Sequence, residues 1–180
     1  MKRWILWLLL VVVTLTCIAC SKQNTQGCIA TTTMPVYTFT KVLCEGTPLS
    51  VELLVQENVS CLHDYTLTVK HMKMLENAEL IVISGAGLES FLDDALPDGK
   101  HLIDASDGIP LHHSLDENEH DHSHPHHHDA DPHFWLSFVC AQQMSHNICN
   151  QLTAAYPQYA ARFQSNLAIL DNKFSDLQKY

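Results

Sequence analysis

Leu80-Ile81-Val82-Ile83, closed by Ser84-Gly85, is the stretch that decides the fold. A continuous apolar run that ends at a turn signal is typical of a strand buried on both faces of a parallel sheet. Such a strand needs helices on both sides to cover it. The stretch therefore predicts an α/β fold.

Strand and helix patterns alternate on both sides of this run. The further strand candidates are Cys28–Thr33, Val51–Val55 and His101–Ala105. The helical patterns between them are Tyr37–Leu43, Thr66–Ala78 and Leu88–Leu96. This β-α-β-α-β order predicts a mainly parallel sheet flanked by helices.

Two more helices are expected after residue 130, over Phe134–Tyr156 and Gln158–Tyr180, divided at Pro157. The second carries an apolar stripe that continues to the last turn: Phe163, Leu167, Leu170, Phe174 and Leu177. A stripe of this kind usually covers another surface. We therefore expect more structure to follow where this sequence stops.

The N-terminus has the layout of a secretory signal. Lys2 and Arg3 precede an apolar run from Trp4 to Leu15, and a small residue, Ala19, stands before Cys20. The stretch Cys17-Ile18-Ala19-Cys20 resembles a bacterial lipobox, which implies cleavage after residue 19 and lipidation of Cys20. An ordinary signal peptide or an uncleaved anchor is the alternative. We expect residues 1–19 to be the signal and the polar residues 20–27 to be a flexible tether.

The overall charge is acidic. The formal net charge is −10, and removal of residues 1–19 takes away Lys2 and Arg3, which gives −10 − 2 = −12. An acidic body with few basic runs argues against nucleic acid as a partner and is compatible with a cationic ligand.

The chain has seven cysteines. Lipidation of Cys20 and loss of Cys17 would leave five, and spacing alone assigns no disulfide. Since none of the five lies in a C-x-x-C pair, a cysteine zinc cluster is not expected, and most should be small buried hydrophobic residues.

A polar stretch over residues 111–130 interrupts the α/β pattern. It contains eight histidines interleaved with Asp and Glu: His112, His113, His120, His122, His124, His126, His127 and His128. Neutral imidazole is the commonest protein ligand for zinc, copper and nickel, and carboxylates can complete the shell. We expect this loop to bind several transition-metal ions weakly, because ordering a flexible loop offsets much of the binding free energy.

Two other histidines lie between a strand and a helix. His63 follows the strand at Val51–Val55, and His133 lies where the histidine-rich loop meets the next helix. Ligand sites in open α/β sheets gather at the carboxyl ends of the strands. We therefore expect His63 and His133 to converge on one edge of the sheet and to bind one metal ion together.

Five pieces in order carry a resemblance to a known family. They are His63-Asp64-Tyr65, Ser84-Gly85-Ala86-Gly87-Leu88-Glu89, Asp104-Ala105-Ser106-Asp107-Gly108-Ile109, the histidine-rich stretch, and Asp131-Pro132-His133-Phe134-Trp135-Leu136. This series resembles the N-terminal lobe of the zinc and manganese substrate-binding lipoproteins of ABC transporters.

The resemblance implies the first lobe of a two-lobe receptor. In that family two α/β lobes are joined by a long helix, so residues 28–157 would form the metal-binding lobe and residues 158–180 the start of the linking helix. His63 and His133 would be two metal ligands, and the second lobe would supply the rest. The family's prolines beside the first histidine are replaced here by Cys61-Leu62 and Thr66-Leu67.

The resemblance also implies the setting. The protein would be an extracytoplasmic receptor, periplasmic or anchored to the bacterial membrane through Cys20, that delivers a divalent metal ion to a membrane permease. The histidines favour Zn²⁺ over Mn²⁺, which prefers oxygen ligands. With two ligands instead of the four that zinc prefers, we expect this chain alone to bind zinc more weakly than a complete receptor.

Two other functions stay open. A surface lipoprotein acting in adhesion or zinc buffering is the alternative to a transport receptor. A zinc-dependent hydrolase could use His63, His133 and a carboxylate such as Asp64 or Asp131, but the sequence has no H-E-x-x-H motif and no evident Ser–His or Cys–His arrangement. We therefore do not expect an enzyme.

Overall fold

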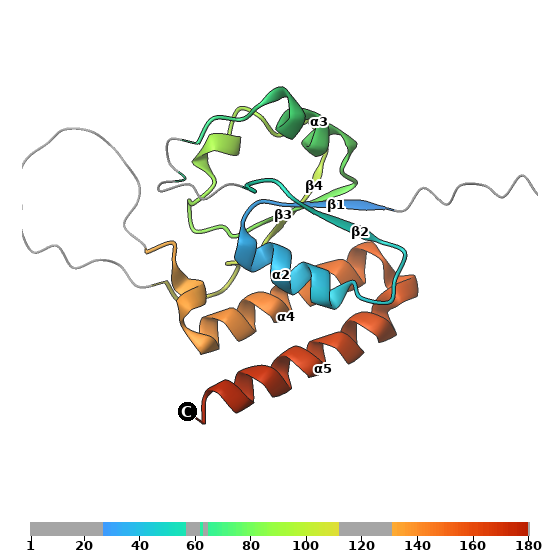
Figure 1. The fold of residues 1–180 in the computed structure, drawn as a ribbon, viewed down its shortest axis with the longest axis vertical. Helices are drawn as coiled ribbons and strands as arrows, with labels where there is room; N and C mark the ends of the chain where they lie inside the picture. Colours follow the sequence, from blue (N-terminus) through green and yellow to red (C-terminus); the bar gives the residue numbers. More distant parts are fainter. Residues whose placement is uncertain (1–26, 57–61, 63–64, 112–130, 180) are drawn as a thin grey trace, which may run out of the picture.

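A four-stranded parallel sheet lies at the centre of the computed structural model (Figure 1). The structure describes residues 27–56, 62, 65–111 and 131–179. The strand order is β2-β1-β3-β4, and every neighbouring pair is parallel. The strands are β1 (Cys28–Thr31), β2 (Ser50–Leu53), β3 (Leu80–Ile83) and β4 (His101–Asp104). The predicted fold class and all four predicted strands are confirmed.

Helices cover both faces of the sheet (Figure 1). One face carries α2 (Met34–Leu43), α4 (Phe138–Ala155) and α5 (Ala160–Leu177). The other carries α3 (Val69–Asn77) and the short 3₁₀ helix η1 (Ser90–Leu92). Ile81 packs toward α3 and Val82 toward α2 and α4, and neither is exposed. Strand β3 therefore contributes side chains to both cores. Burial of one such side chain contributes about 1.5–3 kcal/mol to the stability of the fold.

The helix predicted over Leu88–Leu96 is wrong. The structure has only the 3₁₀ turn η1 there, followed by non-helical turns. Gly85, Ala86 and Gly87 all have positive φ, at 83°, 54° and 76°, so the chain leaves β3 in a left-handed loop. Glu89 then turns its side chain back onto this loop, and the backbone does not continue as an α-helix.

The helix predicted over Phe134–Tyr156 is interrupted near its start. Phe134–Leu136 form the 3₁₀ helix η2, Ser137 is extended with ψ 127°, and α4 begins only at Phe138. The break at Pro157 is as predicted, because the residue before a proline is disfavoured in the α region. Tyr156 accordingly leaves the helix with φ −131° and ψ 66°, and the 3₁₀ helix η3 (Pro157–Tyr159) leads into α5.

Helix α5 folds back beside α4 and also contacts α2 (Figure 1). Four residues of its apolar stripe are buried in the core: Phe163, Leu167, Leu170 and Phe174. The Phe174 ring meets the edge of Phe39 with the centroids 5.8 Å apart. Leu177, the last member, is 51% exposed. The surface that most of the stripe covers is therefore within this chain.

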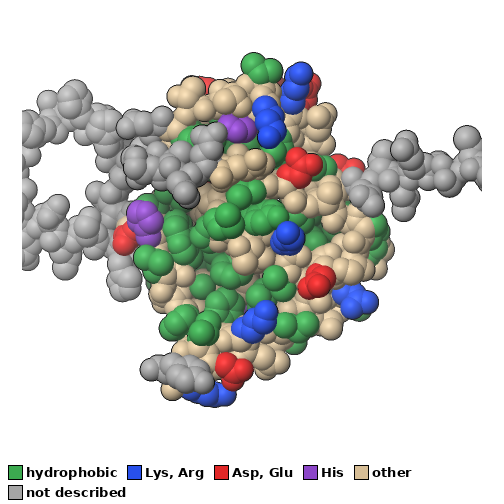
Figure 2. Space-filling model, in the orientation of Figure 1, with side chains coloured by type: hydrophobic (Ala, Val, Ile, Leu, Met, Phe, Trp, Pro, Cys, Tyr) green, Lys and Arg blue, Asp and Glu red, His purple; other side chains and the backbone are tan. Residues whose placement is uncertain are grey.

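The exposed side of these helices carries apolar side chains with single charges between them (Figure 2). Met34 on α2 and Ile169 on α5 are 58% and 48% exposed. Among the helices that the structure describes, none combines the length and the apolar composition that a bilayer crossing requires. The predicted signal segment and Cys20 lie outside the described residues.

The four cysteines in the described part are free thiols. Cys44 and Cys149 are buried, as predicted for small hydrophobic residues, whereas Cys28 and Cys140 are half-buried. Burial, together with the neighbouring Cys149, raises the pKa of Cys44 to about 12. Cys44 is therefore a packing group and a poor nucleophile.

Polar contacts fix α5 to the rest of the lobe. Asn166 on α5 donates from Nδ2 to the carbonyl oxygens of Leu43 and Glu45, both at 2.9 Å, at the end of α2. Asp171 on α5 accepts from Gln142 at 2.7 Å and lies 2.9 Å from His146 Nε2, both on α4. One helix is thus tied to two others.

We predict that Asn166→Ala will lower the free energy of unfolding by about 1–3 kcal/mol, because it leaves two carbonyls at the end of α2 without their donor. Urea denaturation at neutral pH measures the change. Asn172→Ala, on the exposed side of the same helix, is the matched control and should change stability by less than about 0.5 kcal/mol. Equal effects of the two substitutions would show that the contact to α2 contributes nothing.

Candidate metal centre

The carboxyl ends of the parallel strands meet at one edge of the sheet, at the left in Figure 1. The segment that carries His133 reaches the same edge (Figure 1). Phe134 packs in one core cluster with Ala105 and Ile109, which follow β4. The predicted placement of His133 beside the strand ends therefore agrees with the fold.

A buried carboxylate organises this edge. Glu89, 6% exposed, accepts hydrogen bonds from the Thr32 hydroxyl at 2.6 Å, the Ser84 backbone N–H at 2.7 Å and the Gly85 backbone N–H at 3.0 Å. Burial raises the pKa of Glu89, and these three hydrogen bonds oppose the rise. Thr33 completes the contact, with its hydroxyl 2.6 Å from that of Ser84. The loops after β1 and β3 are thus joined through one side chain.

The loop after β4 is joined to the same edge. Asp104 accepts from the backbone N–H and the hydroxyl of Ser106, at 2.8 and 2.7 Å, and the Ala86 N–H donates to the Ser106 hydroxyl oxygen at 3.1 Å. Gly85 has φ +83° and lies so close to Asp104 and Ser106 that a Cβ at this position would collide with both. Only glycine fits here.

His133 is oriented by Asp131. The Asp131 Oδ1 atom accepts a hydrogen bond from the His133 backbone N–H at 2.9 Å. The same oxygen lies 2.9 Å from the Nδ1 atom of the His133 ring. A carboxylate partner keeps the proton on Nδ1, so the neutral ring carries its lone pair on Nε2. Trp135 holds the ring from another side, edge to face, with the centroids 5.4 Å apart.

Exposure makes this histidine available to a ligand. The side chains of His133 and Asp131 are 58% and 61% exposed. A half-exposed imidazole whose Nδ1 atom is held by a carboxylate can coordinate a metal ion through Nε2. The geometry therefore fits a metal ligand at this position.

The other predicted ligands are not placed. His63 and all eight histidines of the loop lie outside the described residues, as does Cys20. Among the described residues, no three His, Cys, Asp or Glu side chains converge as a metal site would require. The convergence of His63 with His133 stays a prediction.

The flanks of His63 are described. The Tyr65 backbone N–H donates to the Leu62 carbonyl at 3.1 Å. The Tyr65 ring meets the edge of Phe91 in η1, with the centroids 5.2 Å apart. Since η1 directly follows the loop that Glu89 holds, Tyr65 lies at the same edge of the sheet as that loop.

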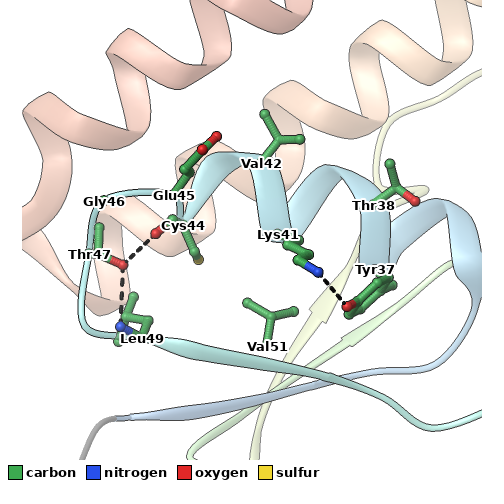
Figure 3. Close-up of a pocket in the computed structure, with 10 residues that line it drawn as sticks. All are labelled: Tyr37, Thr38, Lys41, Val42, Cys44, Glu45, Gly46, Thr47, Leu49 and Val51. Atoms are coloured by element: carbon green, nitrogen blue, oxygen red, sulfur yellow. Dashed lines mark hydrogen bonds between the residues drawn. The ribbon is translucent and has the colours of Figure 1, made fainter.

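A hollow of about 580 Å³ lies elsewhere on the protein, between α2 and β2 (Figure 3). Its lining includes Val42 and Val51, and Lys41 donates to the Tyr37 hydroxyl at 3.0 Å on its wall. His133, which is the predicted metal ligand that the structure describes, is not among its lining residues. The hollow and His133 therefore lie at different places on the protein. Because a metal ion needs ligand atoms more than a cavity, we place the candidate metal site at His133.

The sequence did not assign a role to Glu89. It is part of the motif Ser84–Glu89, but its burial depends on three partners, one of which, Thr32, is 57 residues away. A single acidic residue after Gly-Ala-Gly-Leu, followed by a serine and then an apolar pair, is a weak signal for a buried carboxylate. The sequence also did not predict the contacts of His71 with Thr68 and Tyr65, or those of Asn147 with the carbonyls of Ala105 and Asp107.

Comparison with known proteins gives the family. Residues 29–180 match the family described as zinc-uptake complex component A, periplasmic (ZnuA). The chain belongs to this family. The match covers the whole described part except residues 27 and 28, so the resemblance noted from the five motifs is confirmed.

Individual relatives agree with this assignment. The high-affinity zinc uptake system protein ZnuA of Bacillus subtilis is 32% identical over 177 residues, which cover 89% of this chain and 55% of the relative. The zinc-binding lipoprotein AdcA of Streptococcus pneumoniae is 33% identical over 172 residues, which cover 90% of this chain and 34% of that protein. The crystal structure of the Zn(II)-bound ZnuA-like domain of AdcA superposes with a TM-score of 0.68 at 29% identity, covering 86% of this chain and 54% of that one.

The chain spans about half the length of the Bacillus relative and a third of AdcA. Membership of the ZnuA family therefore fixes the ancestry and fold of this lobe, but the activity of the complete relatives does not transfer with it.

We predict that Asp131→Ala will weaken zinc binding about 10–100-fold, as removal of a histidine's carboxylate partner does at other metal sites. Asp131→Asn keeps an acceptor for Nδ1–H and should lose less. The measurement is zinc calorimetry in a chain whose eight loop histidines are replaced by serine. Asp98→Ala, an exposed acidic residue in the turn before β4 and so at the amino edge of the sheet, controls for charge, and an equal loss there would reduce the Asp131 effect to electrostatics.

Proposed function

We propose that this chain is the first metal-binding lobe of an extracytoplasmic zinc receptor that serves an ABC permease. The observation that carries the proposal is the pair Asp131–His133 at the carboxyl edge of a ZnuA-family sheet, with the imidazole exposed and its Nε2 atom available. A receptor needs a ligand that an ion can reach from solvent, and His133 meets that requirement.

His63 and His133 are the proposed ligands of the ion. His63 belongs to the segment flanked by Leu62 and Tyr65, and Tyr65 lies at the edge that Glu89 organises. Zinc is proposed as the metal because two imidazoles suit it better than they suit manganese, and because relatives are named for zinc uptake and zinc binding. Mn²⁺ is the alternative.

A second surface is proposed to close over the ion. Leu136 and Val139, beside His133, are 77% and 67% exposed, and Phe138 is 44% exposed. A group of exposed apolar side chains usually marks a contact surface. We infer that residues 28–157 form the lobe that presents His133, that residues 158–180 begin a linking helix, and that the remaining zinc ligands come from a second lobe.

The transport setting follows from the same proposal. The segment 1–19 would direct export, Cys20 would carry the lipid, and residues 20–27 would tether the lobe to the membrane. The histidines of residues 111–130 would collect zinc near the ligand edge. A receptor is favoured over an enzyme because the relatives carry names of uptake and binding proteins.

We predict that His133→Ala and His63→Ala will each abolish the tightest zinc site. Zinc calorimetry of the chain with its eight loop histidines replaced by serine should give one site, lost in either variant and kept in His101→Ala, which replaces an exposed histidine on β4. Binding should be weaker than in a complete two-lobe receptor, since only two of four ligands are supplied. A single tight site that persists in both variants would refute the proposed ligands.

Zinc binding should also weaken as the pH falls from 7 to 5, because protonated imidazole cannot coordinate a metal. The same calorimetric titration at pH 7, 6 and 5 measures it, with circular dichroism at each pH to confirm that the chain stays folded. Full affinity at pH 5 would mean that carboxylates and not histidines are the dominant ligands.

A further inference from the structure

The backbone of His133 is fixed on both sides. Its N–H donates to the Asp131 carboxylate at 2.9 Å, and the Leu136 N–H donates to its carbonyl oxygen at 3.1 Å. These bonds do not fix the torsions of the side chain. A histidine whose torsions are free loses conformational entropy when it coordinates a metal ion, and this loss weakens binding. The contacts that the imidazole ring makes before the ion arrives therefore matter for affinity.

One of the two ring contacts is exposed to water. The Nδ1 atom of His133 lies 2.9 Å from the Asp131 carboxylate, but the two side chains are 58% and 61% exposed. Water competes for both groups at such a site, so exposed pairs of this kind hold side chains only weakly. A contact that water cannot replace would restrict the ring further.

Trp135 provides that contact and connects the His133 ring to the core. The His133 and Trp135 rings meet with the centroids 5.4 Å apart and the planes at 61°, and Trp135 meets Phe134 at 5.9 Å and 69°. Both pairs have the edge-to-face arrangement that aromatic rings prefer. Phe134 is 8% exposed and belongs to the core cluster against which Trp135 packs. Three rings thus lead from the exposed imidazole to the interior of the lobe.

We propose that Trp135 is a positioning residue for the zinc ligand His133, because its ring restricts the imidazole before the ion binds. The inference rests on the proposed function, since it takes His133 as a ligand. A ligand that is held in place loses less entropy on coordination, so its support raises the affinity. The indole ring has an N–H donor and no acceptor for a metal ion. Trp135 therefore acts on zinc only through another residue.

Two substitutions at Trp135 test this role. Trp135→Leu keeps an apolar side chain and removes the ring, whereas Trp135→Phe keeps a ring. We expect Trp135→Leu to weaken zinc binding about two- to ten-fold, the range for the cost of ordering one side chain, and Trp135→Phe to keep most of the affinity. The measurement is zinc calorimetry of the chain with its eight loop histidines replaced by serine.

Tyr159→Leu is the matched control for stability. It also removes an edge-to-face contact with a buried phenylalanine, Phe163, at 6.3 Å, but it does so in η3, at the other end of α4. Thermal denaturation of the metal-free chain should show a lower melting temperature for this variant, and its zinc affinity should stay within about two-fold of the parent, because less than the cost of ordering one side chain is at stake.

A spectroscopic readout separates the contact with His133 from a general effect on folding. With Trp4 and Trp7 replaced by phenylalanine, Trp135 is the only tryptophan of the chain. Zinc should then change the fluorescence of Trp135 in the parent and should not change it in His133→Ala. In the His133→Ala chain, Trp135→Leu should cause no further loss of zinc binding.

The proposal would be overturned by a Trp135→Leu variant that binds zinc as tightly as the parent, or by equal losses in Trp135→Leu and Trp135→Phe. An equal loss in Tyr159→Leu, or a further loss when Trp135→Leu is added to His133→Ala, would also contradict it, because the effect would then not pass through His133. If His133→Ala itself leaves zinc binding unchanged, the proposed ligand is wrong, which is a failure distinct from that of Trp135.

Discussion

The Glu89 carboxylate is the contact on which the ligand edge depends. It accepts from the loop after β1 and from two consecutive backbone N–H groups after β3, in a position that is 6% exposed. An unpaired carboxylate there would be strongly unfavourable, and the three donors offset that cost. The left-handed path through Gly85–Gly87 leaves these N–H groups without helical partners, and Glu89 supplies the acceptor. The left-handed conformation of this loop and the burial of Glu89 therefore depend on each other.

Side-chain hydrogen bonds join the helices of the α2, α4 and α5 layer to one another and to the loop after β4. Asn166 ties α5 to the end of α2, Asp171 ties it to α4, and Asn147 on α4 donates to the carbonyls of Ala105 and Asp107 after β4, at 3.0 and 2.7 Å. The pKa of Asp171 is lowered: burial acts against this, and the hydrogen bonds from Gln142 and His146 outweigh it. These hydrogen bonds connect α5 to α2 and α4, and α4 to the loop after β4. The proposed linking helix is therefore packed against the lobe over its first turns.

Most of the fold could be predicted from local patterns, and most of the site could not. Leu80–Ile83 was identified to the residue because a continuous apolar run closed by a turn signal indicates a strand that is buried on both faces. The helix predicted at Leu88–Leu96 was wrong because Glu89 makes its contacts with Thr32, 57 residues earlier in the chain, and no window of sequence contains that information. His133 could be identified as a candidate ligand from its motif, and its neighbour Asp131 stood in the same motif. The contact of His71 with Tyr65 could not be predicted, because a histidine in a basic, amphipathic helix gives no sign of what its ring faces.

Which ring nitrogen is engaged separates the histidines of this lobe by role. In His133 the Nδ1 atom faces a carboxylate and carries the proton, so Nε2 has a lone pair for a metal. In His71 the Nδ1 atom accepts from a backbone N–H, so Nε2 carries the proton and faces a hydroxyl. In His146 the Nε2 atom faces the Asp171 carboxylate at 2.9 Å and carries the proton, so the lone pair of the neutral ring is on Nδ1. The neutral-ring lone pair therefore lies on a different atom in each described case: on Nε2 in His133, on Nδ1 in His146, and on Nδ1 in His71, where the Thr68 N–H already uses it.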